Sequence, residues 1–184
     1  MAHRTTEELE AAIDDLREAP GNDGRVELIV RRPVVGEREV VESATLDETV
    51  GLVGDCWQTR GSRSTPDGAA HPEMQITLMN VRCTELVAGE RDRWPLAGDQ
   101  FYVDFDLSTA NLPAGTRIQL GTAVVEVSAA PHTGCAKFTQ RFGLDAMRFV
   151  NSPAGRELRL RGVNTKVVVG GTVSVGDPMR KLGS

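Results

Sequence analysis

Short runs of alternating hydrophobic and polar residues, rich in β-branched side chains, recur along the chain. In the run QFYVDFDL (100–107), Phe101, Val103 and Phe105 fall on one face of an extended strand. Tyr102 and Asp104 fall on the opposite face. We expect further strands in VELIVRR (26–32), REVVES (38–43), MQITLMN (74–80), RIQLG (117–121), AVVEVSA (123–129), LRLRG (158–162) and KVVVGG (166–171).

Turn signals rich in Gly and Pro separate these runs. They include PDG, LPAG, SPAG, VGG and VGDP. Many short strands with such punctuation are typical of a closed or strongly curved β structure. Strands that alternate regularly with long helices are absent, which disfavours Rossmann and TIM-barrel folds. The pattern therefore predicts a mainly β, β-barrel-like fold with a few short helices.

Three segments have the pattern of a helix instead. In TTEELEAAIDDLREAPG (5–21), Thr5 and Glu8 have capping-box spacing, and a Pro-Gly pair follows as a stop signal. Leu9, Ile13 and Leu16 form one apolar stripe along it. Two further short helices are expected in TELVAG (84–89) and GLDAMRFV (143–150).

Length and composition fit one soluble domain. The chain has 184 residues, of which 40% are hydrophobic and 26% charged. We expect residues 1–20 to form an N-terminal helical extension and residues 21–184 a single barrel domain. The polar, acidic start is unlike a signal peptide, and no apolar run approaches the roughly 18 residues that span a bilayer. We therefore expect a cytoplasmic protein without a membrane partner, in which thiols stay reduced.

The charge of the chain is unevenly distributed. A formal net charge of −5 argues against a nucleic-acid partner. Residues 131–166, however, hold seven basic and two acidic residues, so this block carries +5 and the rest of the chain −10. A basic block in an acidic protein suggests an anionic ligand. The alternative is a set of arginines on solvated strand faces.

Cys135 is the residue with the most suggestive local sequence, PHTGCAKFTQRFG (131–143). His132 and Lys137 are close to it, and Gly134 permits a close backbone approach or a positive φ. If CAKFTQRF begins a helical turn, the thiol lies at its N-terminus. Cations and helix N-termini favour the reactive thiolate. Cys56 and Cys83 have no comparable setting, and the alternative for Cys135 is an inert thiol in a turn.

Other chemistries find less support in the sequence. A zinc site would need His71 or Asp55 to join His132 and Cys135 across the fold, and the spacing does not favour it. Three cysteines without a CxxC pair argue against a disulfide framework. There is no G-x-S-x-G motif and no phosphate-binding Gly loop. The loop GSRSTPDG (61–68), with Arg60 before it, could contact an anion or simply be an exposed polar loop.

Five segments in order resemble one family. They are VGLVGDCW (50–57), ANLPAGTRIQLGTAVVEVS (110–128), PHTGCAKF (131–138), RFG (141–143) and RLRGVNTKVVVGGTVSVGD (159–177). Together they resemble a stand-alone MOSC domain, the module named for the C-terminal part of molybdenum cofactor sulfurases. VELIVRRPVVGEREVVESATL (26–46) is similar to the lead-in strands of such members, so the resemblance covers nearly the whole chain.

The resemblance implies a strand-rich, barrel-like fold with one characteristic cysteine, matched here by Cys135. It implies that this cysteine carries sulfur as a persulfide or ligates the molybdenum of molybdopterin. Guanidinium groups such as Arg141 and Arg161 suit the phosphate of that cofactor, and Lys137 would tune the thiolate. Asn111 falls where relatives have Glu-Asn-Leu, and it would either order a loop beside the site or cap a turn.

Two departures from the family pattern qualify the resemblance. The sequence His-Thr-Gly-Cys replaces the Pro-Cys patterns of molybdenum-binding members and marks a different subgroup. No pyridoxal-phosphate desulfurase domain is present, so sulfur would come from a small donor or from a sulfur-donor protein such as a desulfurase.

Three hypotheses follow from the sequence. In the first, Cys135, activated by His132, carries sulfur or ligates molybdenum. In the second, the protein is a non-catalytic binding or delivery module for an anionic pterin-type ligand or a sulfur-transfer partner. In the third, Cys135 is buried and the motif only encodes the barrel. Whether the protein is an enzyme, and whether it is a monomer or a homodimer, are open at this point.

Overall fold

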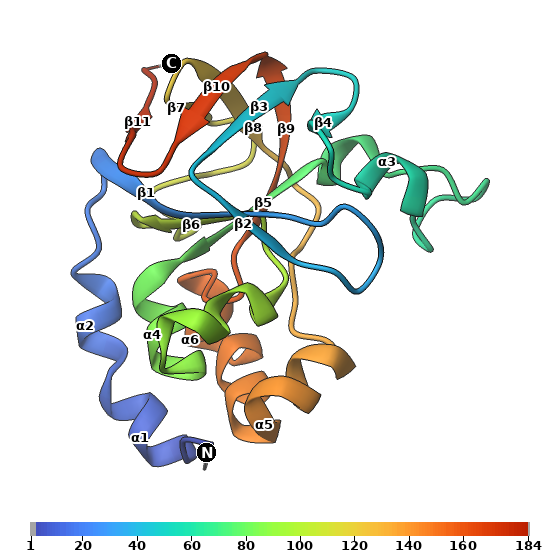
Figure 1. Ribbon diagram of the computed structural model, residues 1–184. Helices are drawn as coiled ribbons and strands as arrows, with labels where there is room; N and C mark the ends of the chain where they lie inside the picture. The colour runs from blue at the N-terminus through green and yellow to red at the C-terminus, as the bar shows by residue number, and fades with distance from the viewer. Residues whose placement is uncertain (1–2, 184) are drawn as a thin grey trace.

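The structure, a computed structural model, describes residues 3–183 and is built around a closed seven-stranded barrel (Figure 1). The barrel strands are β1 (Asp23–Arg31), β5 (Ile76–Asn80), β6 (Phe101–Asp104), β7 (Arg117–Leu120), β8 (Ala123–Val127), β9 (Val163–Val169) and β11 (Pro178–Lys181). Their order around the barrel is β1-β11-β7-β8-β9-β5-β6, and β6 returns to β1. Neighbours are antiparallel except β5 and β6, which are parallel. The mainly β, barrel-like prediction is confirmed.

The remaining strands extend this barrel. The short strand β2 (Glu39–Val41) pairs with the end of β1, and together they form a hairpin. A second, three-stranded sheet has the order β10-β3-β4, with β10 at Gly171–Ser174, β3 at Ser43–Asp47 and β4 at Gly51–Leu52. This sheet lies at the end of the barrel away from most helices (Figure 1).

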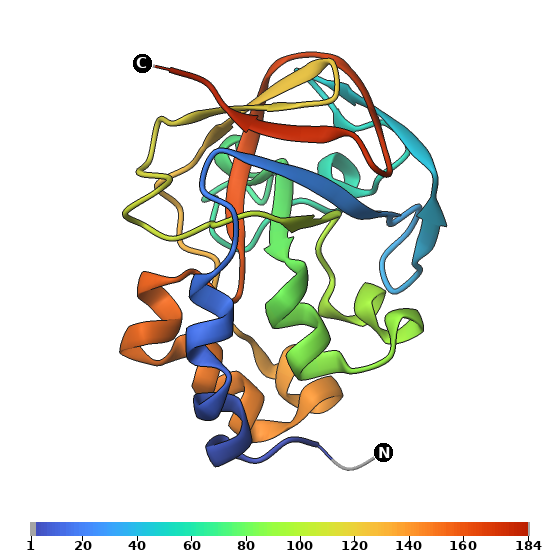
Figure 2. The ribbon, with the colours of Figure 1, turned by 90° about the vertical axis from the view of Figure 1, so that its left-hand side faces the viewer.

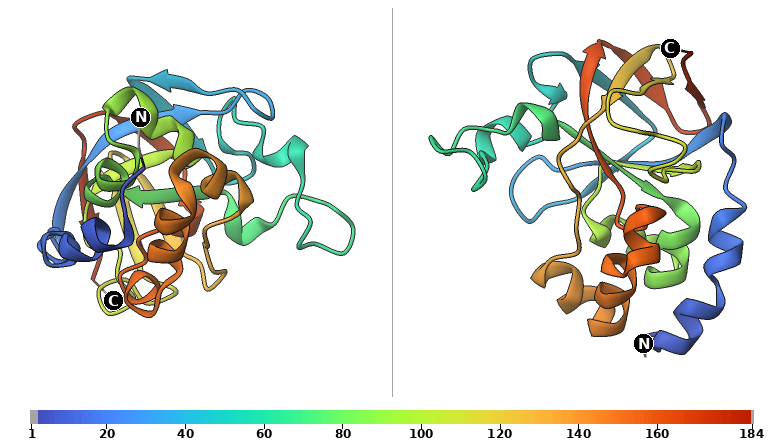
Figure 3. Two further views of the ribbon diagram at one scale, coloured as in Figure 1. Left: turned by 90° about the horizontal axis from the view of Figure 1, so that it is seen from below. Right: turned by 180° about the vertical axis from the view of Figure 1, so that it is seen from behind.

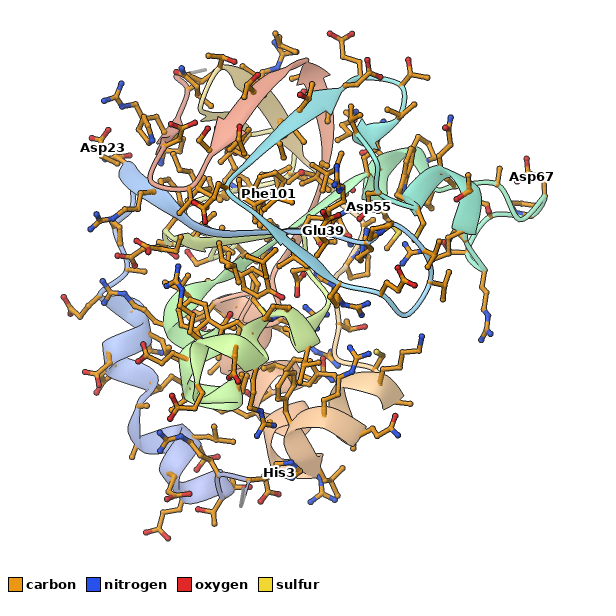
Figure 4. All side chains as sticks on the ribbon, viewed as in Figure 1. His3, Asp23, Glu39, Asp55, Asp67 and Phe101 are labelled. Carbon is orange, nitrogen blue, oxygen red and sulfur yellow. The ribbon has the colours of Figure 1, made fainter. Side chains whose placement is uncertain are left out.

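Most of the helices form a layer at one end of the barrel, the lower end in Figures 1 and 2. They are α1 (Thr6–Ala11), α2 (Ile13–Arg17), α4 (Val81–Ala88), η2 (Arg91–Ala97), α5 (Ala136–Asn151) and α6 (Pro153–Glu157). The other two, α3 (Trp57–Arg60) and η1 (Pro72–Met74), flank a loop that projects from the barrel (Figure 3). Asp67 marks the tip of this loop in Figure 4. No helix in residues 3–183 is long and apolar enough to cross a membrane.

Two hydrophobic cores result from this arrangement, one inside the barrel and one between barrel and helices. Strand β6 serves both because its side chains alternate. Phe101 and Val103 are fully buried in the barrel core. Tyr102 is fully buried in the second core, where its hydroxyl donates a hydrogen bond of 2.8 Å to the carbonyl of Trp94. The polar face expected from the alternation is therefore covered by helices rather than by water.

The helix expected near the N-terminus forms as two short helices, α1 and α2, which meet at Ala12, and it begins with the predicted cap. Thr5 accepts a hydrogen bond from the Glu8 backbone, and the Glu8 carboxylate accepts one from the Thr5 backbone, which completes a capping box. Leu9 and Leu16 are buried in the second core, beside residues of α4 and α5. Burial of this stripe, rather than helix propensity alone, holds the short helices in place.

One predicted strand is wrong. Residues 158–162, LRLRG, form a turn after α6 instead of a strand. The expected SPAG turn is itself the start of that helix, because Ser152 caps it and Pro153 occupies its first turn. Positive φ angles at Arg159 (48°) and Gly162 (100°) then reverse the chain into β9. Both other predicted helices are present, TELVAG within α4 and GLDAMRFV within α5.

Candidate functional site

Cys135 is the N-cap residue of α5, so the predicted helical turn after the cysteine is confirmed. Its thiol is exposed, which contradicts the hypothesis of a buried structural cysteine. The preceding Gly134 has no positive φ but makes a close approach. A side chain there would come within 2.9 Å of the Asn151 amide, and the Gly134 N–H donates to the Asn151 Oδ1 at 3.0 Å. Gly134 and Asn151 thus fix the backbone that presents Cys135.

The two other cysteines differ from Cys135 in burial. Cys83 is fully buried in the second core, and burial raises the pKa of its thiol to about 12. Cys56, which caps α3, is also buried, but it lines the same cavity as Cys135. Of the three thiols, only that of Cys135 is exposed to solvent.

A cavity of about 260 Å³ opens where the β1–β2 hairpin, α3 and the start of α5 meet. Cys135, His132 and Lys137 are among the residues that line it. Six lining residues are Arg or Lys and none is Asp or Glu, so the cavity favours an anion. These cations are Arg32, Arg38, Arg60, Lys137, Arg141 and Arg161. The predicted basic pocket beside the cysteine therefore exists in the structure.

Two of these six cations already have a carboxylate partner. Arg161 donates to the fully buried Asp99 at 2.6 Å and lies 5.1 Å from the ring centroid of Phe138. Arg32 forms a two-pronged pair with Asp55, with both distances 2.8 Å. Burial opposes the charge of Arg32, but Asp55 outweighs it, and the net effect raises the pKa of Arg32. The charges of Arg32 and Arg161 are thus balanced within the protein.

His132 lies in the wall of the cavity with its side chain 15% exposed. Its Nδ1 is 3.5 Å from an oxygen of Asp99 without forming a hydrogen bond. Burial, and secondly the charge of Arg161, lower the pKa of His132 to about 3, although Asp99 acts in the opposite direction. The imidazole is therefore neutral at physiological pH. Among the described residues it has no hydrogen bond to Cys135, so direct activation of the thiol by His132 stays a prediction.

Unpartnered buried atoms gather at this wall. In residues 3–183, the buried side-chain atoms without a hydrogen-bond partner are one each of Asp99, His132, Arg161 and Asn164. A second hollow of about 410 Å³ lies on the other side and shares His132, Arg161 and Asn164 with the first cavity. Buried polar groups are usually hydrogen-bonded, so these four atoms leave hydrogen-bonding capacity unused between the two hollows.

The other predicted anion-binding residues are divided between two places. Lys137 and Arg141 line the cavity, one on each turn of the first part of α5. Arg60 at the end of α3 and Ser62 in the projecting loop line it as well, so the start of this loop takes part in the cavity. Asn111 does not line it.

Asn111 instead orders the chain on another side of the barrel. Its amide donates to the carbonyls of Gly21 and Asp106, both at 2.8 Å, and its Oδ1 accepts from Lys181 at 2.7 Å. These contacts tie the N-terminal segment to the end of β11. The structure therefore gives Asn111 a role in ordering the fold at a distance from Cys135.

The residues considered for zinc do not assemble into a metal centre. His71, His132 and Cys135 line one cavity. Within residues 3–183, however, no group of three or more His, Cys, Asp and Glu side chains is placed to hold a metal ion. The Nδ1 of His71 accepts a hydrogen bond from the backbone of Glu73 at 3.2 Å, and Asp55 is engaged by Arg32.

Three residues of the site escaped the sequence analysis. Asp99, Arg32 and Arg38 lie far from the PHTGCAKF motif in sequence. Arg32 and Arg38 line the cavity only through the fold, and Asp99 reaches it indirectly, as the partner of Arg161. The sequence held one weak signal for Arg32, which is the second of two consecutive arginines at a strand end, directly before a proline. Nothing in the sequence linked it to Asp55.

Solved structures resemble the chain, although no family model and no curated protein matches it. The YuaD protein from Bacillus subtilis has a TM-score of 0.57 and 15% identity, over 85% of this chain and 94% of its own. YiiM from Escherichia coli has a TM-score of 0.55 and 21% identity, over 87% of this chain and 70% of its own. YiiM from Geobacillus stearothermophilus has a TM-score of 0.58 and 14% identity, over 87% of this chain and 75% of its own. These likenesses show the fold and fit the MOSC-like fold that the sequence resemblance implies.

Proposed function

We propose that this protein carries sulfur on Cys135, which accepts a sulfane sulfur and holds it as a persulfide. The observation that supports the proposal best is the position of the exposed Cys135 thiol in the lining of a cavity with six cations and no carboxylate. Cations beside a thiol favour the thiolate, which is the nucleophilic form. Lys137, two residues after Cys135, is the nearest of these cations in sequence.

The transfer step needs no external oxidant. The Cys135 thiolate attacks the outer sulfur of a donor persulfide and forms a new S–S bond. The S–S bond of the donor breaks, and the donor leaves as a thiolate. The persulfide formed on Cys135 then lies in the same cation-lined cavity as the thiol did.

Persulfide loading tests this proposal. The protein is incubated with a small, uncharged organic persulfide, and the mass of each cysteine peptide is measured after blocking with an alkylating reagent. We expect one added sulfur atom on the Cys135 peptide and none on the buried Cys83 peptide. The Cys135→Ser variant, with unchanged circular dichroism, should carry no added sulfur. Equal loading of Cys83, or no loading of Cys135, would refute the proposal.

The MOSC-like fold also raises the question of a molybdenum cofactor. One thiolate is too few ligands for a bare ion, but it suits a cofactor that brings most of its own metal ligands. Cys135 would bind the metal, and Lys137 and Arg141 would hold an anionic part of the cofactor. When bound, such a group would supply redox chemistry at the metal. Metal analysis of purified wild type and of Cys135→Ser tests this candidate, with loss of molybdenum in the variant as its expected result.

A binding or delivery module is the second candidate function. The observation that favours it is the surplus of cations in the cavity beyond those paired with carboxylates. A module of this kind would keep its affinity for an anionic ligand in Cys135→Ser and lose it in Arg141→Gln. A sulfur carrier, by contrast, loses its central function when the thiol is removed.

A further inference from the structure

Two unpartnered buried atoms, one on Asp99 and one on His132, face each other in the wall of the cavity. The Nδ1 of His132 lies 3.5 Å from the Oδ1 of Asp99, and neither atom has a hydrogen-bond partner within residues 3–183. The other carboxylate oxygen of Asp99 accepts from Arg161 at 2.6 Å. A closer approach of roughly 0.3 Å would bring Nδ1 and Oδ1 into hydrogen-bond range. These two atoms therefore lack only a proton between them and a small movement.

The surroundings hold the imidazole in place but offer its Nδ1 no other partner. A Cβ built on Gly162 would lie 3.4 Å from Nδ1, so this nitrogen faces bare backbone on that side. The N–H of Gly162 already donates to a carbonyl of its own turn at 2.7 Å. The segment before His132 is anchored by the amide of Asn164, which donates to the carbonyls of Ala130 at 3.1 Å and Pro131 at 3.2 Å.

This geometry distinguishes the two neutral forms of His132. Burial, and secondly the charge of Arg161, lower the pKa of His132 to about 3, so the ring carries a single proton at physiological pH. With the proton on Nε2, two buried acceptors would face each other without a donor, which is costly. With the proton on Nδ1, the Nδ1–H donates to Asp99 and satisfies both atoms at once.

The second ring nitrogen of His132, Nε2, is open to solvent. Within residues 3–183 it has no hydrogen-bond partner, yet it is not one of the unpartnered buried atoms. His132 lines both the cavity beside Cys135 and the second hollow. The six cationic side chains of the cavity can only donate hydrogen bonds. An unprotonated Nε2 adds an acceptor to this donor-rich lining.

We infer that Asp99 is a positioning residue, which holds His132 in the Nδ1–H tautomer and so presents an unprotonated Nε2 as a hydrogen-bond acceptor for a ligand. For the sulfur transfer proposed above, that ligand is a neutral hydropersulfide, whose outer S–H donates to Nε2 while the Cys135 thiolate attacks the same sulfur. This contact rests on the proposed function. The tautomer does not, because it follows from the wall of the cavity alone.

Nitrogen-15 NMR of the full chain, labelled at its histidine nitrogens, tests the tautomer. The spectra are recorded at pH 8, above the ordinary histidine pKa of about 6.5. We expect His132 mainly in the Nδ1–H form. His71 is the internal control and should have the opposite, Nε2–H form, because its Nδ1 accepts from the backbone of Glu73. His132→Asn and His71→Asn identify the signals. A His132 in the Nε2–H form, or without a preferred form, overturns the inference.

Two variants separate Asp99 from the buried pair to which it belongs. Asp99→Leu/Arg161→Met removes both charges and the acceptor, so His132 should lose its preference for the Nδ1–H form. Arg161→Gln keeps the acceptor, so the tautomer should remain. Circular dichroism checks folding, and the tautomer of wild type decides if a variant unfolds. An unchanged tautomer in the double variant, or its loss in both variants, would remove the role of Asp99.

Persulfide loading connects the tautomer with the proposed function. His132→Phe removes Nε2 itself, and Asp99→Leu/Arg161→Met removes its orientation. Each should slow the loading of Cys135 by the uncharged organic persulfide about two- to tenfold, the worth of one hydrogen bond. Unchanged loading in His132→Phe overturns the contact between Nε2 and the persulfide. A wild type with the expected tautomer but no loading of Cys135 leaves the positioning role of Asp99 standing and removes the sulfur-carrier function.

Discussion

Asp99 is buried in the wall of the cavity, where Arg161 balances its charge. The pair is separated by 62 residues in sequence and joined by a contact of 2.6 Å. Removal of one partner of a buried pair leaves an uncompensated charge in a poorly solvated place, which costs far more than the net value of the pair. The Asp99–Arg161 pair is therefore a structural support for the wall that also carries His132.

Asp99→Asn should lower the free energy of unfolding by about 3–5 kcal/mol. Arg161 would then remain buried with an amide in place of its carboxylate. Urea denaturation measures the effect. The double variant Asp99→Leu/Arg161→Met should be more stable than Asp99→Leu alone, because it removes both charges. If the single and double variants lose the same stability, the pair is not coupled as we describe.

His132 gives the protein a pH-dependent stability. Its pKa is lowered to about 3 in the folded state, mainly by burial, whereas an unfolded histidine titrates near 6.5. Above pH 6.5 both states are neutral and His132 contributes nothing. As the pH falls below 6.5, only the unfolded state takes up the proton, so stability is lost progressively toward pH 3.

His132→Asn should therefore reduce the loss of stability between pH 7 and pH 5. Urea unfolding at both pH values measures this loss in wild type and variant. The range from pH 7 to pH 5 lies above that in which most carboxylates titrate. His3 and His71 are present in both proteins, so the difference between the two stability losses reports on His132. An identical loss in the two proteins would show that His132 is not held neutral in the folded state.

At this scale the sequence revealed only part of the site. Cys135, His132, Lys137 and Arg141 were found because they lie within ten residues of one another. Asp99 and Arg38 were not found, since their contacts with Arg161 and with the Pro95 carbonyl span 62 and 57 residues of sequence. Local patterns indicate which residue types are present, but not which distant charge balances them.

The helix that carries Cys135 is interrupted at Gly143. This residue has φ 92° and ψ 166°, a region that residues other than glycine avoid, and it divides α5 into two segments. The first segment carries Cys135, Lys137 and Arg141, and the second packs Phe149 and Val150 into the core. The sequence RFG thus sets the direction in which the cavity-lining turns of α5 run.

Gly143→Ala should destabilise the protein by about 1–3 kcal/mol, measured by thermal or urea denaturation. The new methyl group would also lie within 2.7 Å of His3 Nδ1. His3→Ala in the same chain should restore the part of the loss that comes from this contact. Gly115→Ala is the control, because Gly115 also has a positive φ, of 89°, but open space around it. A Gly143→Ala variant as stable as wild type would contradict the strained junction.

Elements with a strong pattern were predicted well. The alternation of β6 and the capping box of α1 depend on neighbouring residues, and both are present. The segment LRLRG was predicted wrongly because its alternating Leu and Arg residues imitate a strand. In the structure it is a turn after helix α6, with positive φ angles at Arg159 and Gly162.

At the scale of the whole molecule, barrel closure pairs the first strand of the chain with the last. β1 and β11 pair with Asp23 opposite Arg180, which places the first and the last strand side by side. The sequence predicted the barrel from the number and length of its strands, but not this closing pair or the parallel β5–β6 contact, since strand order is not encoded in local alternation.

The central claim is that Cys135 is a solvent-accessible thiol in a cationic cavity. The most direct measurement is native-state alkylation, followed by peptide mass spectrometry at each of the three cysteines. Anionic iodoacetate and neutral iodoacetamide are compared at low and high salt. We predict that Cys135 reacts first of the three cysteines. The ratio of its alkylation rate with iodoacetate to that with iodoacetamide should exceed the same ratio for a free cysteine, and high salt should lower it. A Cys135 that stays unmodified until the protein unfolds, or that shows no preference for the anionic reagent, would contradict the account.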